Sequence, residues 1–232
     1  MTDNKIPEPA LPAARVDGPN NLEPLIPAGV EKEPMLLLDT TGSMSYPISA
    51  TSTIQRKDLV GEAMGALVGA LETFDSQALE EAAKGEEGGL MTITFAGGTA
   101  ECIDDLSTAN WRDKWAKIQW GGGTAIMPGW NLLEETYAEE FGERPNLDRP
   151  NILALVVTDG ELTDADQFEA TLKATSSRTY VVIALVGYGE EHDRALASYK
   201  KIAETNTRLR VVSFDSETDP MQIAADLLEL VK

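Results

Sequence analysis

The sequence predicts an α/β domain with a doubly wound, mostly parallel sheet, and two patterns indicate it. Short continuous apolar runs, such as Ile152 to Val157 and Val181 to Val186, are typical of central strands covered on both faces. Stretches with apolar residues at helical spacing lie between these runs. Strands that alternate with helices in this way favour a sheet with helices on both faces.

The chain is predicted to hold one domain and an N-terminal arm. Its 232 residues, 42% of them hydrophobic, are enough to bury one sizeable core. Prolines recur among charged and small residues through residues 1–33, at Pro7, Pro9, Pro12, Pro19, Pro24 and Pro27. We therefore expect residues 1–33 to form an extended or disordered arm and residues 34–232 to form the domain.

The net charge and the cysteine content limit the classes of partner and the compartment. The chain has 19 basic and 39 acidic residues, a formal charge of −20, which repels nucleic acids and anionic membranes. Cys102 is the only cysteine and favours a reducing compartment. No secretory signal is visible at the N-terminus, and the apolar runs are too short to cross a bilayer. We expect a soluble cytoplasmic protein.

The first half of the domain begins with the strand Met35 to Leu38, and a helix from Lys57 to Phe74 follows a loop. Gly61, Gly65 and Gly69 lie on one stripe of this helix, where we expect close packing against the sheet. A second, acidic helix is predicted at Ala78 to Lys84. Met91 to Phe95 and Ala100 to Ile103 then read as a hairpin around Gly97 and Gly98.

The second half of the domain alternates helices and strands. A helix is predicted at Asn110 to Gln119, and Gly121 to Gly123 form a loop before a helix at about residues 128–141. After the strand Ile152 to Val157, Thr163 and Asp166 have the spacing of a capping box. The strand Val181 to Val186, a helix to about Thr205, the strand Leu209 to Phe214 and a helix from Pro220 complete the domain.

Oxygen-bearing side chains follow the predicted strands at one edge of the sheet. Asp39 ends the first strand and precedes hydroxyl residues that include Thr41 and Ser43, Thr124 follows the triple glycine, and Asp159 follows Ile152 to Val157. The carboxyl ends of parallel strands meet at one edge, so we expect these side chains to converge. Carboxylate and hydroxyl oxygens suit a hard cation such as Mg²⁺.

The combined pattern D-x-T-G-S, G-G-G-T and T-D-G resembles the metal-ion-dependent adhesion site (MIDAS) of the von Willebrand factor type A (VWA) family. The family pattern is D-x-S-x-S followed by a distal Thr and a distal Asp. Thr41 departs from it but keeps the hydroxyl. The resemblance covers about residues 33–232. It implies a three-layer, Rossmann-like sheet of about six strands, with one antiparallel edge strand supplied by the hairpin at Gly97 and Gly98.

The resemblance also implies a function and a metal site. The ligands would be Asp39, Thr41, Ser43, Thr124 and Asp159, holding Mg²⁺, with Mn²⁺ or Ca²⁺ as possible replacements. Similar domains are protein-binding modules, not enzymes, in which a partner's Glu or Asp completes the coordination of the ion. Similar intracellular domains act beside ATPases or with kinase and phosphatase partners.

The same residues also allow an enzymatic alternative. Residues 39–43 also look like the D-K-T-G-T motif of aspartyl-phosphate phosphotransferases and phosphatases, with Asp39 as the nucleophile. Against it, Thr40 stands in place of the lysine, and the G-G-G-T loop has no role in that chemistry. A nucleotide P-loop is excluded because the triple glycine lacks the motif's lysine.

Two other kinds of side chain lie near the expected site. The tryptophans flank the Thr124 loop, and we expect them to pack in the core or between helices, with Trp120 as the best candidate for an exposed contact. His192, the only histidine, is expected to be a solvated loop residue.

Overall fold

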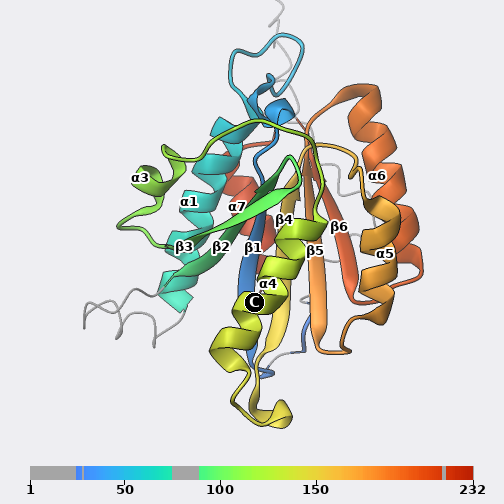
Figure 1. The fold of residues 1–232 in the computed structure, drawn as a ribbon. Coiled ribbons are helices and arrows are strands. Elements are labelled where there is room, and N and C mark those ends of the chain that lie inside the picture. Colours follow the sequence, from blue (N-terminus) through green and yellow to red (C-terminus); the bar gives the residue numbers. More distant parts are fainter. Residues whose placement is uncertain (1–24, 28, 75–88, 216–217, 232) are drawn as a thin grey trace, which may run out of the picture.

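The computed structural model of the chain describes residues 25–27, 29–74, 89–215 and 218–231 (Figure 1). Most of the predicted arm and the predicted helix Ala78 to Lys84 lie outside these ranges. Within them, strand β1 begins at Lys32, two residues before the predicted start of the domain. Ile26, in the last part of the predicted arm, is buried in the core.

A six-stranded sheet forms the centre of the molecule, in the order β3-β2-β1-β4-β5-β6. The β2–β3 pair is antiparallel and every other pair is parallel, so β3 is the antiparallel edge strand that was predicted. The strands are β1 (Lys32–Asp39), β2 (Leu90–Ala96), β3 (Thr99–Leu106), β4 (Asn151–Thr158), β5 (Thr179–Val186) and β6 (Leu209–Phe214).

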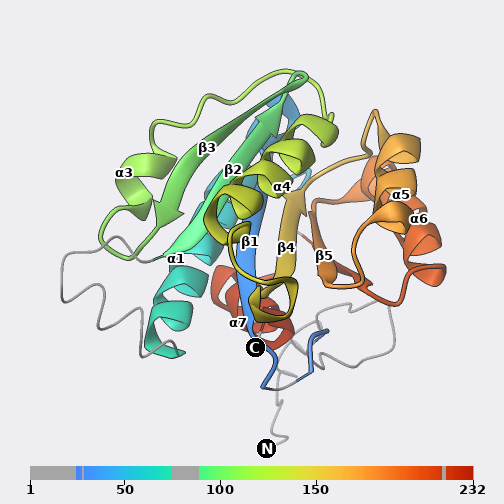
Figure 2. The same cartoon turned by 60° about the horizontal axis from the view of Figure 1, so that its bottom comes forward.

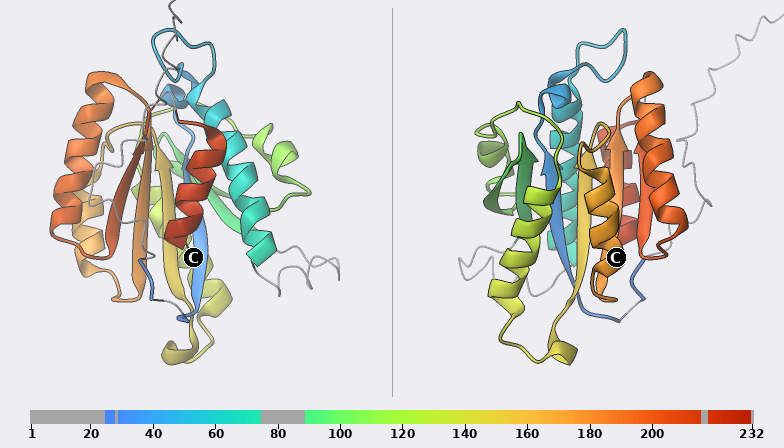
Figure 3. Two further views of the ribbon diagram at one scale, coloured as in Figure 1. Left: turned by 180° about the vertical axis from the view of Figure 1, so that it is seen from behind. Right: turned by 45° about the vertical axis from the view of Figure 1, so that its right-hand side comes forward.

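Helices cover both faces of the sheet (Figures 1 and 2). Helices α1 (Arg56–Phe74) and α7 (Pro220–Val231) lie side by side on one face, as the view from behind shows (Figure 3). The other face carries α4 (Met127–Phe141), α5 (Ala165–Ala174) and α6 (Gly189–Glu204). Short elements are η1 (Gly42–Ser45), α3 (Trp111–Trp115) and η2 (Asn146–Asp148).

The core has two layers because alternate residues of each central strand point to opposite faces. Leu36 and Leu38 of β1 pack into the cluster under α1 and α7. Met35 and Leu37 pack into the cluster under α4, α5 and α6. Both faces of β1 are therefore buried, which explains its continuous apolar sequence.

Two glycines of the stripe in α1 pack against a helix and not against the sheet, so that part of the prediction was wrong. A Cβ at Gly65 would lie 2.5 Å from the ring of Trp111, and one at Gly61 would lie 2.8 Å from Nε1 of Trp115. Both tryptophans belong to α3, which ends at Trp115 and is thus shorter than predicted. The small residues let α3 dock closely on α1.

Candidate functional site

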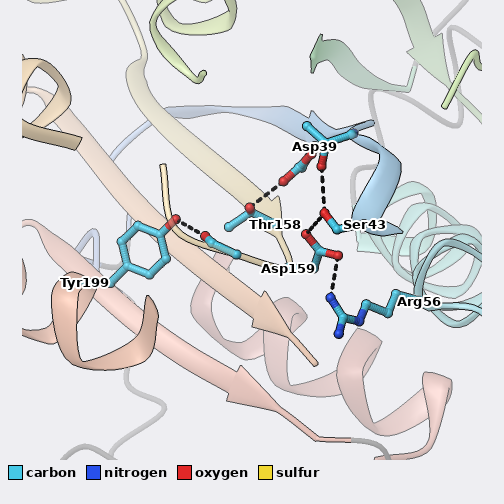
Figure 4. A network of polar contacts seen from close by, with 8 residues as sticks. Asp39, Ser43, Arg56, Thr158, Asp159 and Tyr199 are labelled. Carbon is cyan, nitrogen blue, oxygen red and sulfur yellow. Dashed lines mark hydrogen bonds and ion pairs between the residues drawn. The ribbon is translucent and has the colours of Figure 1, made fainter. Parts of the chain in front are cut away.

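The carboxyl ends of β1 and β4 hold the two predicted carboxylates at one edge of the sheet (Figure 4). The two strands are parallel neighbours with Leu38 opposite Val157. Asp39 is the last residue of β1, and Asp159 comes directly after β4. The strand pairing itself therefore brings these two acidic residues together.

Asp39 is fully buried, and each of its carboxylate oxygens accepts a hydrogen bond. The backbone N–H of Thr41 donates to Oδ1 at 2.8 Å, and the hydroxyl of Thr158 donates to Oδ2 at 2.6 Å. Burial, followed by the nearby charge of Asp159, raises the pKa of Asp39 to about 6. A cation beside Asp39 would therefore stabilise its ionised carboxylate.

Hydroxyl groups connect the residues after β1 with Asp159. The hydroxyl oxygens of Thr41 and Ser43 lie 3.1 Å apart, and Ser43, in η1, donates to Oδ1 of Asp159 at 2.8 Å. Asp39, Thr41, Ser43 and Asp159 thus form one cluster of oxygen donors, linked by these hydrogen bonds and by the turn from Asp39 to Thr41.

Thr124 follows the triple-glycine loop, which packs against the residues directly after β1. The N–H of Gly121 donates to the carbonyl of Thr40 at 2.8 Å, and the N–H of Gly42 donates to the carbonyl of Gly122 at 3.4 Å. Gly122 has a φ of +81°, and a Cβ there would lie 2.8 Å from the backbone of Gly97. The glycines therefore permit close packing between this loop and the β2–β3 turn.

Asp164 holds the end of the triple-glycine loop, where α4 begins. Its carboxylate accepts the backbone N–H groups of Ile126 at 3.0 Å and Met127 at 2.8 Å, at the start of α4. The capping box predicted at Thr163 and Asp166 was wrong, because α5 begins at Ala165 and its N-cap, Asp164, makes no side-chain bond to α5. Asp164 instead caps a helix that precedes it in the chain.

Arg56 is part of the site, although sequence reasoning did not identify it. Its Nη1 lies 2.7 Å from Oδ2 of Asp159, with the two side chains 10% and 0% exposed. The guanidinium carbon is 6.0 Å from the ring centre of Tyr46 and 5.9 Å from that of Tyr188. The signal that could have identified Arg56 is its position as the first residue of a helix, where the helix dipole disfavours a cation.

No protein-family model and no curated protein matches the sequence. Solved structures match the fold. The SpRpn10 VWA domain aligns with a TM-score of 0.60 and 11% identity over 88% of this chain and 98% of its own. A von Willebrand factor type A protein from Catenulispora acidiphila aligns with a TM-score of 0.51 and 18% identity, over 86% of this chain and 42% of its own. The chain has the von Willebrand factor type A fold.

Another protein with this fold is described with an occupied metal site. Proximal thread matrix protein 1 from the mussel byssus has zinc in its MIDAS motif and aligns with a TM-score of 0.52 and 15% identity. The alignment covers 86% of this chain and 45% of the mussel chain. In the present VWA fold, the hydroxyl–carboxylate cluster lies at the edge where the sequence pattern predicted a MIDAS.

The chemistry of the cluster is that of oxygen donors. Among the described residues, no group of three or more His, Cys, Asp or Glu side chains is arranged to hold a metal ion. The predicted set contains only two carboxylates and completes its donors with hydroxyls, so it fits a hard cation and does not fit a soft one. No helix within the described ranges is long and apolar enough to cross a membrane.

His192 lies close to Arg56 and is not a solvated loop residue, so that prediction was wrong. It is on α6 and only 6% exposed, and its Nε2 lies 2.7 Å from the hydroxyl of Ser213. Burial, as the main cause, lowers its pKa and favours the neutral ring. Gly187 lies between His192 and Arg56, because a Cβ there would be 3.1 Å from Nδ1 and 3.6 Å from the guanidinium carbon.

The tryptophans near the site mainly pack inside the protein. Trp130 is fully buried and stacks edge-on against Phe168 at 5.4 Å. Trp120, the best candidate for an exposed contact, is half-buried. Its ring centre lies 5.7 Å from that of Trp115 and 5.6 Å from the ammonium of Lys57. Tyr46 and Tyr188, which flank Arg56, are exposed aromatic residues.

Proposed function

We propose that the chain is a metal-dependent protein–protein interaction module that captures a Glu or Asp side chain of a partner protein. The observation that carries the proposal is the cluster of Asp39, Thr41, Ser43 and Asp159, in which two buried carboxylates and two hydroxyls meet at the carboxyl edge of a VWA sheet. The zinc-occupied MIDAS of the mussel protein supports a divalent ion in this role.

Asp39, Thr41, Ser43, Thr124 and Asp159 would hold the ion. We propose Mg²⁺, which prefers oxygen ligands, and hydroxyl-rich sites also accept Mn²⁺ or Ca²⁺. When bound, the ion would supply a position for one further oxygen ligand. Only two of the five protein ligands carry negative charge, which favours a carboxylate as that further ligand.

The exposed side chains around the site support a protein as the partner. Tyr46, Ile54 and Tyr188 are among the exposed large hydrophobic residues, and Tyr46 and Tyr188 lie next to the buried Arg56. Aromatic side chains are enriched in protein interfaces. The formal charge of −20 disfavours nucleic acids and anionic membranes. Partners in ATPase or in kinase and phosphatase systems are compatible with this surface.

We propose no catalytic role for this site. An aspartyl-phosphate mechanism would use Asp39 as the nucleophile, but Thr40 stands where that motif has its lysine, and the triple-glycine loop has no role in that chemistry. The single cysteine favours a reducing compartment, so we propose that the module works in the cytoplasm.

Calorimetric titration of Mg²⁺ into EDTA-treated protein tests the metal site. We expect one-site binding in the wild type and its loss in Asp159→Ala. Ser43→Ala removes one hydroxyl of the cluster and should weaken binding, whereas Ser45→Ala, two residues along in the same short helix, is the matched control. Equal binding by all four proteins would reject the proposed ligands.

A peptide array tests capture of an acidic side chain. Each peptide with a central Glu or Asp is paired with the same peptide carrying Gln or Asn, and the array is probed in Mg²⁺ and in EDTA. We expect hits that require both the carboxylate and the metal. Hits that survive EDTA and the amide substitution would show that the binding surface lies elsewhere.

A further inference from the structure

Arg56 forms an ion pair with one oxygen of Asp159, a ligand of the proposed metal site. Oδ2 of Asp159 contacts Nη1 of Arg56 at 2.7 Å, and Oδ1 accepts the hydroxyl of Ser43 at 2.8 Å. The close-up shows Arg56 and Ser43 on different oxygens of this carboxylate (Figure 4). A metal ion at Asp159 would therefore be a close neighbour of a fixed positive charge.

Arg56 is held in place from several directions. Its backbone N–H donates to the carbonyl of Tyr46 at 3.0 Å, and the rings of Tyr46 and Tyr188 each lie about 6 Å from its guanidinium carbon. It is buried, and Gly187 leaves room beside it that a side chain would fill. The guanidinium is thus a built-in part of the site and not a solvated group that can swing away at little cost.

The guanidinium also has unused capacity to bind an anion. Its buried Nε has no hydrogen-bond partner among the described residues, and the buried Nδ1 of His192, on the other side of Gly187, also has none there. Of the two, Nε of Arg56 always carries a hydrogen, and a buried N–H without an acceptor is costly. An additional oxygen acceptor at this edge would give the Nε–H of Arg56 a hydrogen-bond partner.

We infer that Arg56 is a counter-ion that makes metal binding depend on an anionic ligand: it weakens the site for the bare ion and strengthens it for the ion together with a carboxylate. This inference rests on the metal site of the proposed function. With Asp39 and Asp159 ionised and Arg56 charged, the three groups carry a net charge of −1. A divalent ion brings the total to +1, and a carboxylate then neutralises it.

Removing the guanidinium charge reverses this balance. In Arg56→Gln the two carboxylates would carry −2, and a divalent ion alone would neutralise them. We therefore expect this variant to bind Mg²⁺ about tenfold or more tightly than the wild type, since a unit charge in direct contact with a ligand opposes the cation strongly. The variant should also lose the preference for a further carboxylate.

The experiment measures Mg²⁺ affinity by calorimetry in sodium acetate and in sodium chloride of equal ionic strength, with acetate as the probe for a carboxylate. For the wild type we expect tighter Mg²⁺ binding in acetate, because the coupling of two ligands is reciprocal. For Arg56→Gln we expect tight binding in both salts. Lys57→Gln removes the same charge from the next residue, whose ammonium lies over Trp120, and should behave like the wild type.

The outcomes separate the inference from the proposed function. Wild-type binding of Mg²⁺ that does not change with acetate, or an Arg56→Gln variant that binds Mg²⁺ no more tightly than the wild type, overturns the inference and leaves the metal site standing. Absence of Mg²⁺ binding in every protein and both salts overturns both. The wild-type comparison of the two salts needs no variant, so it remains decisive if Arg56→Gln does not fold.

Discussion

The hydroxyl of Thr158 donates to Oδ2 of Asp39 at 2.6 Å and links the ends of the two central parallel strands, β1 and β4. Thr158 is itself fully buried, so this bond joins two groups that water does not reach. Because Asp39 is the candidate metal ligand that begins the sequence motif, the bond also fixes the carboxylate at the edge of the sheet where the other ligands gather.

We expect Thr158→Val to destabilise the protein by about 1–3 kcal/mol, because a buried carboxylate oxygen loses its donor. The loss should be larger at pH 8, where Asp39 is ionised, than at pH 5. Thr158→Ser keeps the hydroxyl and removes only a methyl group, so its loss should not change with pH. Urea unfolding in EDTA at the two pH values measures both variants. If Thr158→Val and Thr158→Ser lost the same stability at both pH values, the hydroxyl of Thr158 would have no role.

Asp39→Asn should make the metal-free protein more stable above pH 6. The pKa of Asp39 is raised from 3.8 to about 6 in the folded protein, so the folded state binds the proton more tightly than the unfolded state. The stability that this group contributes is complete below pH 3.8 and is lost as the pH rises through 6. Asparagine stays neutral and keeps acceptor and donor atoms for Thr41 and Thr158.

Thermal and urea unfolding in EDTA from pH 4 to 8 measures this effect. We expect the difference between Asp39→Asn and the wild type to grow across that range, to about 2–3 kcal/mol at pH 8. Asp166→Asn, an exposed change on α5, controls for the net charge of the chain. If the stability curves of the two proteins stay parallel across this pH range, the pKa of Asp39 is not raised in the folded protein. Added Mg²⁺ should stabilise only the wild type and the control.

The strand ends of the site were predictable because two short-range patterns agree. The buried strands are continuous apolar runs, and topology makes their carboxyl ends meet, so placing Asp39 and Asp159 together needed no long-range information. The edge hairpin was also predictable, because Gly97 and Gly98 both need a positive φ.

Contacts made across large sequence separations could not be predicted in this way. Arg56 reaches Asp159 over 103 residues, and nothing around Arg56 in the sequence points to that carboxylate. The side chain of His192 turns inward to Ser213, although its neighbours Glu190 and Glu191 are exposed. The glycines of α1 pack against tryptophans of α3 that lie about fifty residues away, as Gly65 and Trp111 show.

Gly122→Ala should be costly, and Gly123→Ala should not. Gly122 has a φ of +81°, and its Cβ would lie 2.8 Å from the backbone of Gly97, whereas a Cβ at Gly123 meets nothing within 4 Å. We expect the first change to cost about 1–3 kcal/mol and the second less than about 0.5 kcal/mol. Urea unfolding compares the pair. Equal stability would show that the loop can move away from the β2–β3 turn without cost.

Asp164→Ala should destabilise the start of α4 although Asp164 is 37 residues away from Met127 in the sequence. Both carboxylate oxygens are used, one by the N–H of Ile126 and one by the N–H of Met127, and the negative charge lies at the positive end of the helix dipole. We expect a loss of about 1–2 kcal/mol. Asp164→Asn should lose less, because it keeps one oxygen acceptor but has no charge.

Hydrogen exchange at Ile126 and Met127 measures the local effect directly, and Asp166→Ala, exposed on the first turn of α5, is the control. We expect faster exchange at these two amides in Asp164→Ala only. The loop that carries Thr124 ends where these amides begin, so a cap that holds them also holds the loop. If Asp164→Ala left the exchange of both amides unchanged, the start of α4 would be held by its own packing, through the buried side chains of Met127 and Trp130.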